Sequence, residues 1–226
     1  MLIIFDCDGV LVDSEVIASA VLAKHLTLAG FPYTSQECME RFAGLSLDSC
    51  RVLIEVEAKK TLSEDFFLQV QRETFSRFSE DLKPVVGVID VLDFVSEHQW
   101  SCCVASSGSH EKMALTLKKT GLQKYFSDRI YSATDVQYGK PAPDLFLYAA
   151  QSLSYLPEHC VVIEDSKPGV MAALAAGMQV CALGNQHEAS ADTRIFTRMA
   201  ELPAILTSLS LARSFPCWVT KNSIAK

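Results

Sequence analysis

Short apolar runs recur along the chain and predict the strands of a sheet. They lie at residues 2–5, 102–105, 161–163 and 180–183, with a weaker fifth run at 129–132. Most of them are followed by a polar or glycine-containing turn and then by a helical pattern, which is typical of a parallel sheet. Because each run is almost continuously hydrophobic, we expect helices on both faces of this sheet. The pattern predicts an α/β fold with a doubly wound, Rossmann-like parallel sheet.

Residues 14–82 break this alternation, because they carry helical periodicity without a convincing strand. The next predicted helix, at 88–98, leads back to the sheet, so the two ends of the insert are expected to lie close together. We therefore predict a core made of residues 1–13 and 83–226 and an inserted helical-bundle cap, residues 14–82, that can act as a lid. The predicted cap helices span 14–29, 35–42, 47–59 and 63–80.

Composition and charge narrow the class of protein. The chain has 226 residues, 49% of them hydrophobic, and its 20 basic and 27 acidic residues give a net charge of −7. The sequence has no basic stripe that could follow a nucleic-acid backbone, so no nucleic-acid partner is expected. No apolar run reaches the roughly eighteen residues of a membrane span, and Asp6 interrupts the first run too early for a signal peptide. We expect a cytoplasmic protein without a membrane partner, either a monomer or a weak homodimer.

The eight cysteines have no framework spacing, and most lie in apolar runs. A thiol in such a run behaves as a small hydrophobic side chain, so we expect reduced core cysteines and no zinc site. The five histidines show no metal-ligand spacing either, and we interpret them as surface or helix-end residues.

Polar residues follow the predicted strands at the points where the strands end. Since the carboxyl ends of parallel strands meet at one edge of a sheet, these residues should lie close together, beside helix N-termini that favour anions. The group consists of Asp6 and Asp8 after the first strand, Ser106, Ser107 and Gly108 after the second, Lys140 before a helix, and Glu164 with Asp165 after the strand at 161–163.

This grouping predicts phosphoryl chemistry. Carboxylates crowded without a counter-ion have raised pKa values, so a hard divalent cation is the natural occupant, and Mg²⁺ suits carboxylate and phosphate oxygens best. An aspartate beside the cation can attack phosphorus while a second protonates the leaving oxygen; we expect Asp6 to attack and Asp8 to move the proton. Lys140 and the Ser106 hydroxyl would offset charge on the phosphoryl oxygens.

The same residues resemble the four motifs of the haloacid dehalogenase superfamily, which here are FDCDGV, VASSG, GKPAPD and VIEDS. The resemblance covers nearly the whole chain and is closest to phosphatase and phosphomutase members with a small helical cap. It implies Asp6 as the nucleophile, Asp8 as the acid/base, and Ser106, Ser107, Gly108 and Lys140 as phosphate binders. It also implies that Mg²⁺ is held by Asp6, the Asp8 backbone carbonyl and Asp165, with Glu164 a further ligand, and that the bond between Lys140 and Pro141 is cis.

Several residues have a structural alternative. Ser106 could cap a helix, although Ser109 is the better cap candidate. Glu164 could hydrogen-bond neighbours without binding metal. In the stretch ERFAGLS, Arg41 and Gly44 either determine substrate specificity, with Arg41 meeting a sugar hydroxyl or carboxylate, or merely end a helix.

The aromatic residues of the last cap helix are interpreted as cap core rather than as a ligand cage. They are Phe66, Phe67, Phe75 and Phe78.

The branch of the family is decided by a few positions. Asp8 favours a leaving oxygen, which needs a proton, over a halide, which does not. A β-phosphoglucomutase is the alternative, but Ala18 and Leu47 stand where such mutases typically carry a histidine and an arginine. The stretch DSEVI and the RFAG turn resemble bacterial phosphosugar phosphatases, including those for 6-phosphogluconate. We expect a phosphatase for a small phosphorylated sugar or sugar acid; a non-catalytic binding protein on the same fold is the third hypothesis.

Overall fold

The computed structural model describes residues 1–214 except 43–44, 46, 60, 186 and 188. Within these residues, six parallel strands form one sheet in the order β3-β2-β1-β4-β5-β6. The predicted doubly wound α/β class is confirmed. The strands are β1 (Leu2–Phe5), β2 (Ser101–Ser106), β3 (Ile130–Ser132), β4 (Cys160–Glu164), β5 (Gln179–Leu183) and β6 (Thr193–Phe196).

Helices connect these strands and form the insert after β1. They are α1 (Glu15–Leu28), α2 (Ser35–Phe42), α3 (Leu47–Ala58), α4 (Glu64–Asp81), α5 (Val88–Glu97), α6 (His110–Lys119), α7 (Gln123–Phe126), α8 (Asp144–Ser152), α9 (Lys167–Ala175) and α10 (Leu202–Ser214).

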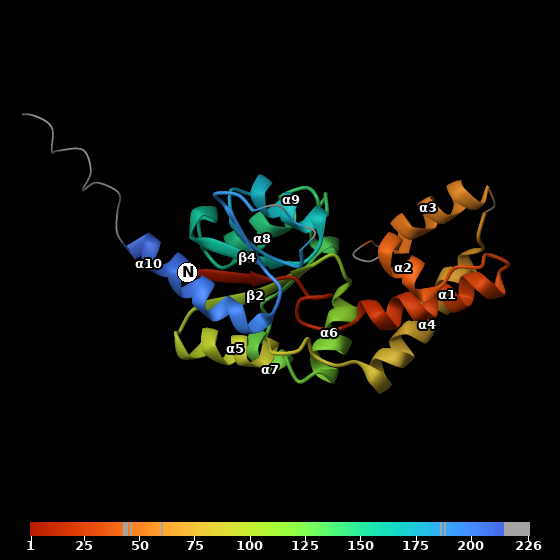
Figure 1. Ribbon diagram of the computed structural model, residues 1–226, viewed down its shortest axis with the longest axis horizontal. Coiled ribbons are helices and arrows are strands. Elements are labelled where there is room, and N and C mark those ends of the chain that lie inside the picture. The colour runs from red at the N-terminus through yellow and green to blue at the C-terminus, as the bar shows by residue number, and fades with distance from the viewer. Residues whose placement is uncertain (43–44, 46, 60, 186, 188, 215–226) are drawn as a thin grey trace, which may run out of the picture.

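The sheet is buried on both faces, as its continuous apolar strands require. Ile3 and Phe5 of β1 point to the face covered by α5, α6, α7 and α10, whereas Leu2 and Ile4 point to the face covered by α8 and α9. Figure 1 shows α8 and α9 on one side of the strands and α5 and α7 on the other. This alternation places β1 in the centre of the core, with its carboxyl end at the edge nearest the insert.

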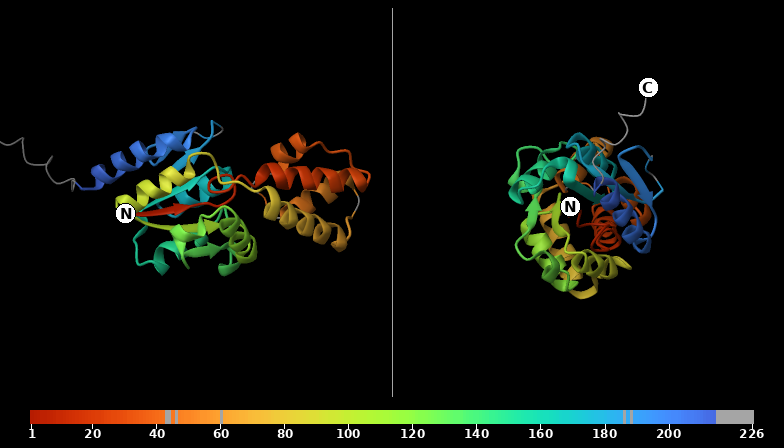
Figure 2. Two further views of the ribbon diagram at one scale, coloured as in Figure 1. Left: turned by 90° about the horizontal axis from the view of Figure 1, so that it is seen from below. Right: turned by 90° about the vertical axis from the view of Figure 1, so that its left-hand side faces the viewer.

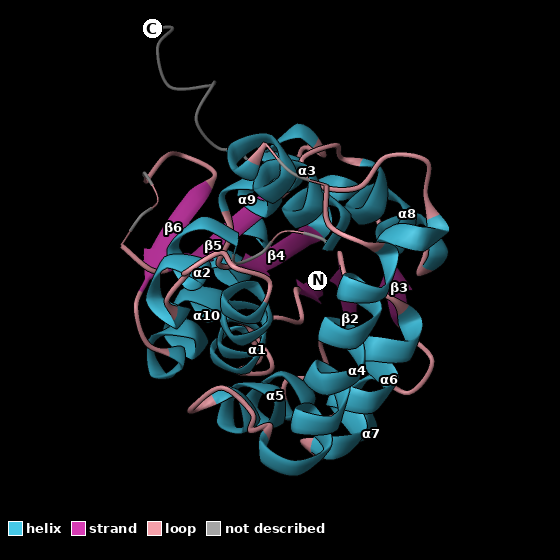
Figure 3. Ribbon diagram, turned by 90° about the vertical axis from the view of Figure 1, so that its right-hand side faces the viewer, coloured by secondary structure: helices cyan, strands magenta, loops and turns pink. Residues whose placement is uncertain are grey.

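The insert has an apolar core of its own, formed by α1 to α4. Leu26, Phe42, Ile54 and Phe67 belong to it, one from each of these helices. Figure 3, which looks at the molecule from the insert side, shows these helices in front of the strands.

Two neighbouring segments join the insert to the core. The Asp13 amide donates to the Lys83 carbonyl at 3.0 Å, and the Val85 amide donates to the Leu11 carbonyl at 3.0 Å. The boundaries predicted at residues 13 and 83 lie at this pair of hydrogen bonds. The left-hand view of Figure 2 shows the two segments side by side between the two parts of the molecule.

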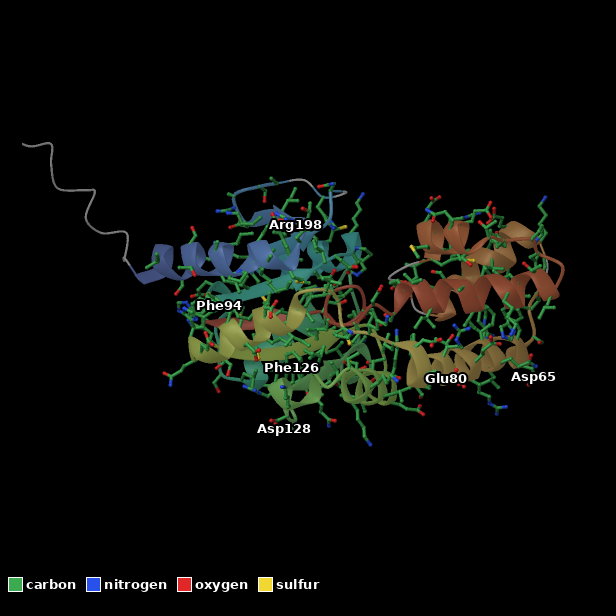
Figure 4. All side chains as sticks on the ribbon, turned by 60° about the horizontal axis from the view of Figure 1, so that its bottom comes forward. Asp65, Glu80, Phe94, Phe126, Asp128 and Arg198 are labelled. Carbon is green, nitrogen blue, oxygen red and sulfur yellow. The ribbon has the colours of Figure 1, made fainter. Side chains whose placement is uncertain are left out.

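Helix α4 also meets the core directly. The Lys119 ammonium at the end of α6 donates to the Glu80 carbonyl at 3.0 Å. Figure 4 labels both Glu80, at the end of α4 nearer the core, and Asp65, at the distant end. One end of the last insert helix is therefore attached to the helix that follows β2.

Other features either agree with the sequence analysis or correct it. The seven described cysteines are buried, as expected for thiols in apolar runs. Of the aromatic cluster, Phe66 and Phe67 pack in the insert core, but Phe75 and Phe78 pack against the core that contains β1, so the interpretation as cap core was wrong for the second pair. Among the described residues no helix is both long and apolar enough to cross a membrane.

Candidate active site

Strand β1 delivers both aspartates to the sheet edge. Asp6 continues the β1 ladder, because its amide donates to the Ile163 carbonyl of β4 at 2.9 Å. The chain then turns at once, with the Leu11 and Val12 amides both donating to the Cys7 carbonyl. The Cys7 side chain points into the core, where it is 1% exposed, so the two flanking carboxylates share the other side.

Asp6, Lys140 and Glu164 form a buried charged network. The Lys140 ammonium donates to Asp6 Oδ1 at 2.5 Å and to Glu164 Oε1 at 2.7 Å, and its side chain is only 3% exposed. Burial, which would lower the pKa of Lys140, is outweighed by these two carboxylates, so that pKa is raised. The lysine is therefore a fixed positive charge between two strand ends. The predicted cis bond between Lys140 and Pro141 is confirmed.

Burial also dominates at Asp6. It raises the pKa of this carboxyl to about 7, with Lys140 opposing and the neighbouring Glu164 and Asp8 adding to the rise. The pKa of Asp165 is raised well above its ordinary value by burial, then by Asp6 and Glu164. Lys140 lowers both pKa values, but by less than burial and the neighbouring carboxylates raise them.

Asp8 has a different environment. Its Oδ1 accepts from the Ser14 hydroxyl at 2.5 Å, and its Oδ2 accepts from the Lys112 ammonium at 2.8 Å. Burial would raise the pKa of Asp8, but Lys112 and Ser14 together outweigh it, so that pKa is lowered. The pKa values of the two aspartates of one motif are therefore shifted in opposite directions.

Asp6, Glu164 and Asp165 suit a divalent cation. Each offers a carboxylate oxygen, and these oxygens lie within 4.8 Å of one another. Hard divalent cations bind clusters of carboxylate oxygens of this kind. The positive charge of such a cation would lower the pKa values of Asp6 and Asp165 and so favour their ionised forms. Glu164 has protein partners on both of its oxygens: Oε1 accepts from Lys140, and Oε2 accepts from the Ser166 amide and hydroxyl at 2.6 and 2.9 Å.

Two glycines leave the space that these carboxylates fill. Gly9 has a φ of +76°, and a Cβ there would lie 2.0 Å from Asp165 Oδ2. At Gly169, in the first turn of α9, a Cβ would lie 1.7 Å from Glu164 Oε1. Both distances are shorter than any non-bonded contact, so side chains at these positions would displace the acids.

The segment after β2 lies beside the aspartates. Ser106 is 1% exposed, and its hydroxyl accepts from the Gly108 amide at 3.1 Å. Ser109 caps α6 by accepting from the Lys112 amide, which confirms it as the cap and leaves Ser106 facing the acids. Ser106, Ser107 and Gly108 line the same cavity as Asp6 and Asp8.

This cavity has a volume of about 400 Å³ and lies between the sheet edge and the insert. The core contributes most of its charged side chains. The insert contributes mainly apolar ones, together with a few polar ones; its members are Glu15, Ala18, Ser19, Leu22, Phe42, Leu45, Cys50, Val70, Gln71, Thr74, Phe75 and Phe78.

The structure does not bring every predicted site residue to the cavity. Arg41 is exposed, pairs with Glu57 and stacks near the Tyr33 ring, and it is not among the cavity residues. The predicted specificity role of Arg41 is thus not supported by its position. Gly44 lies outside the described residues.

Some residues of the site were not foreseen from the sequence. Lys112 and Ser14 hold Asp8, and His187 donates from Nε2 to the Asp165 carbonyl at 2.8 Å. The position of Lys112 was the available signal, since it lies in the first turn of α6, where the helix dipole favours acidic residues rather than basic ones. A lysine placed there against the dipole indicates a specific anionic partner.

The sequence model of the family described as haloacid dehalogenase-like hydrolase matches residues 3–183, which contain the whole cavity edge. The chain belongs to this family. It is 31% identical over 208 residues to a 6-phosphogluconate phosphatase of Escherichia coli, covering 90% of this chain and 93% of that protein. It is 34% identical over 178 residues to a phosphorylated carbohydrates phosphatase of Thermotoga maritima, covering 78% and 82%.

A solved structure shares the arrangement of this family member. A haloacid dehalogenase-like protein of unknown function from Agrobacterium tumefaciens superimposes with a TM-score of 0.78 at 36% identity, over 92% of this chain and 98% of that one. The fold is thus that of a haloacid dehalogenase-like hydrolase.

Proposed function

We propose that this hydrolase is a Mg²⁺-dependent phosphatase that cleaves the phosphate monoester of a small sugar or sugar acid through an aspartyl-phosphate on Asp6. The observation that carries the proposal is the convergence of Asp6, Asp8 and Lys140 on one cavity beside the acidic trio of Asp6, Glu164 and Asp165. The phosphatase relatives support the same reaction and the phosphorylated-carbohydrate class of substrate.

In this proposal each core residue has one role. A carboxylate oxygen of Asp6 attacks phosphorus, and the bond from phosphorus to the substrate oxygen breaks. Lys140 holds Asp6 in position and offsets charge on the phosphoryl group, together with the Ser106 hydroxyl and the amides of Ser107 and Gly108. Asp8 enters the first step as the carboxylic acid and gives its proton to the leaving oxygen. The resulting carboxylate then takes a proton from the water that hydrolyses the aspartyl-phosphate, which restores the acid.

The metal would be held by Asp6, the Asp8 backbone carbonyl and Asp165, with Glu164 at the same site or supporting it through Lys140 and Ser166. When bound, Mg²⁺ neutralises charge on the carboxylates and the phosphoryl oxygens. Without that positive charge, an incoming phosphate dianion would meet the carboxylates unscreened, so the cation also permits substrate entry.

The mutase alternative is less well supported by the cavity. A mutase must bind the second phosphate of its intermediate. Ala18 lines the cavity where β-phosphoglucomutases typically carry a histidine that binds the sugar, and its methyl group cannot bind a phosphate. Water should then be the acceptor. The intact acids likewise disfavour a non-catalytic binding protein. We further propose a cytoplasmic location and a monomer or weak homodimer.

The test is release of inorganic phosphate from a panel of sugar phosphates by the purified protein, with Mg²⁺ or with chelator. We expect turnover with Mg²⁺ and none with chelator. Asp6→Asn keeps the size of the side chain but removes the attacking carboxylate, so kcat should fall at least about 1,000-fold. An unchanged melting temperature serves as the folding control, and turnover by Asp6→Asn near the wild-type rate would refute the nucleophile assignment.

A further inference from the structure

The charges around the cavity narrow the substrate class. The described carboxylates that line it are Asp6, Asp8, Glu15, Glu164 and Asp165, and the described cations are Lys112 and Lys140. A smaller cavity of about 200 Å³ shares Leu45, Ser107, Lys140 and Ser166 with it. Lys140 is the charged residue among the described residues that line this second cavity.

Both lysines already have partners on the core side. Lys140 bonds Asp6 and Glu164, and Lys112 bonds Asp8. They lie at the end of the cavity that holds the transferred phosphoryl group in the proposed mechanism. Neither of them belongs to the insert, which faces the remainder of the substrate.

The insert offers no compensating cation among its described cavity residues. Its contribution is apolar or uncharged apart from Glu15, which is acidic and close enough to raise the pKa values of Asp165 and Lys112. Arg41, the nearest candidate in sequence, points to Glu57 instead. The side chains at five positions between residues 43 and 48 are not described. The sequence has no lysine or arginine at these positions, which are Ala43, Gly44, Ser46, Leu47 and Asp48.

The uncharged part of the insert wall suits a polyol. Phe75 and Phe78 are stacked, with ring centroids 6.4 Å apart and planes inclined by 24°. Both border the cavity, but Phe78 is fully buried, so Phe75 presents the aromatic face. Flat aromatic faces pack against C–H groups, while Gln71 and Thr74 on the same helix supply donors and acceptors for hydroxyl groups. A second carboxylate or phosphate placed here would be desolvated beside carboxylates and without a partner.

We infer that the substrate carries a single anionic group, the phosphoryl group that is transferred, and that the remainder is an uncharged sugar or polyol. The inference rests on the proposed phosphatase function and narrows it, because it separates this chain from enzymes that act on phosphorylated sugar acids or bisphosphates. The E. coli relative is named for a sugar-acid phosphate, so the two proteins are expected to differ in specificity.

The test compares pairs of phosphate esters in which one member carries an additional anionic group. Sorbitol 6-phosphate and 6-phosphogluconate are both open chains and differ by a CH₂OH group against a carboxylate; fructose 6-phosphate and fructose 1,6-bisphosphate form a second pair. For the wild-type protein with Mg²⁺ we expect kcat/KM to be at least about tenfold higher for the uncharged member of each pair, because like charges brought together cost several kcal/mol.

A matched pair of variants tests whether the insert wall is responsible. Gln71 lines the cavity, whereas Gln69, on the same helix, is exposed and is not among the cavity residues. Gln71→Arg should raise the ratio of kcat/KM for 6-phosphogluconate over sorbitol 6-phosphate at least about tenfold, as a guanidinium pairs well with a carboxylate. Gln69→Arg adds the same charge to α4 and should leave the ratio unchanged.

The outcomes separate the inference from the proposed function. Phosphate release with equal or higher kcat/KM for the anionic member of each pair would overturn the inference alone. An unchanged ratio in Gln71→Arg, with a melting temperature close to that of the wild type, would also overturn it. If no ester in the panel, including p-nitrophenyl phosphate, releases phosphate, the proposed function fails and the inference fails with it.

Discussion

The surroundings of the two aspartates of the first motif shift their pKa values in opposite directions. Asp8 accepts from both Lys112 and Ser14, and its pKa is lowered. Asp6 shares Lys140 with Glu164, and its pKa is raised to about 7 by burial. Burial raises both pKa values, but at Asp8 it is outweighed by Lys112 and Ser14, whereas at Asp6 it prevails over Lys140, which Asp6 shares with Glu164. In the proposed reaction the cation then completes the neutralisation at Asp6, while Asp8 is held by the protein alone.

Lys112 is therefore expected to be a positioning residue for Asp8. In Lys112→Met the burial of Asp8 is no longer opposed by the ammonium, so the pKa of Asp8 should rise. Asp8 must be ionised to take a proton from water in the hydrolysis step, so the ascending limb of the pH profile of kcat should move to higher pH by about one pH unit. The value of kcat at a pH on that limb should then fall about tenfold.

Lys118→Met is the matched control for this prediction. It removes the same charge from the same helix at an exposed position and should leave the pH profile in place. A Lys112→Met profile that coincides with that of the wild type would show that the ammonium does not govern the proton carried by Asp8.

Among the elements, α9 shows how a local sequence feature supports the site. Ser166 caps this helix by accepting from the Gly169 amide, and the same serine donates to Glu164. Gly169 keeps the first turn open for the Glu164 carboxylate. The end of β4 and the beginning of α9 thus fix Glu164, which in turn fixes Lys140.

Gly169→Ala should disrupt this arrangement through a steric clash with Glu164. We expect weaker Mg²⁺ binding, measured by calorimetry, and a loss of unfolding free energy of about 1–3 kcal/mol. In a Glu164→Ala background the clash partner is gone, so the added cost of Gly169→Ala should largely disappear. Equal costs in both backgrounds would contradict the steric explanation.

The elements also show what the sequence could predict. β1, β2, β4 and β5 were recognisable because strands buried on both faces are continuously apolar. β6 was not, because its four residues include the exposed Arg194 and make a pattern too short to distinguish from a loop. Helix α10 was also not predicted, although Pro203 in its first turn is a typical start signal.

At the site, three of the four motifs could be placed because they directly follow β1, β2 and β4, so the fold itself gathers them; the fourth, with Lys140, lies in the segment between β3 and α8. The insert residues could not, because their facing depends on how four helices pack together. Phe75 and Phe78 lie on the same helix as Phe66 and Phe67, yet they face the cavity and the core rather than the insert interior. Helical spacing alone does not say which neighbour a helix face will meet.

For the molecule as a whole, the acidic trio couples folding to pH and metal. The pKa of Asp6 is raised from 3.8 to about 7, and that of Asp165 is also raised. The metal-free folded protein therefore binds more protons than the unfolded chain between these values. The stability contributed by these two carboxyls is present below the unfolded pKa and is lost as the pH rises through the folded pKa.

A divalent cation should reverse this loss, because it takes the place of the protons. The increase in melting temperature caused by Mg²⁺ is expected to be larger at about pH 8 than at about pH 5. Differential scanning fluorimetry with Mg²⁺ or with chelator at both pH values measures it, and Asp165→Asn should reduce the difference. A Mg²⁺ effect of equal size at both pH values would speak against binding by these carboxyls.

The two hydrogen-bonded segments that join the insert to the core bear on how the substrate preference of such an enzyme can evolve. Because the chain leaves and re-enters the core between Asp13 and Lys83 at neighbouring positions, joined by backbone hydrogen bonds, the sheet is continuous without the insert. A helical insert of another length or sequence can therefore begin and end at this junction without changing the sheet. A new substrate preference can then be acquired by replacing residues 14–82 as one unit, while Asp6, Asp8, Lys140 and Asp165 stay untouched.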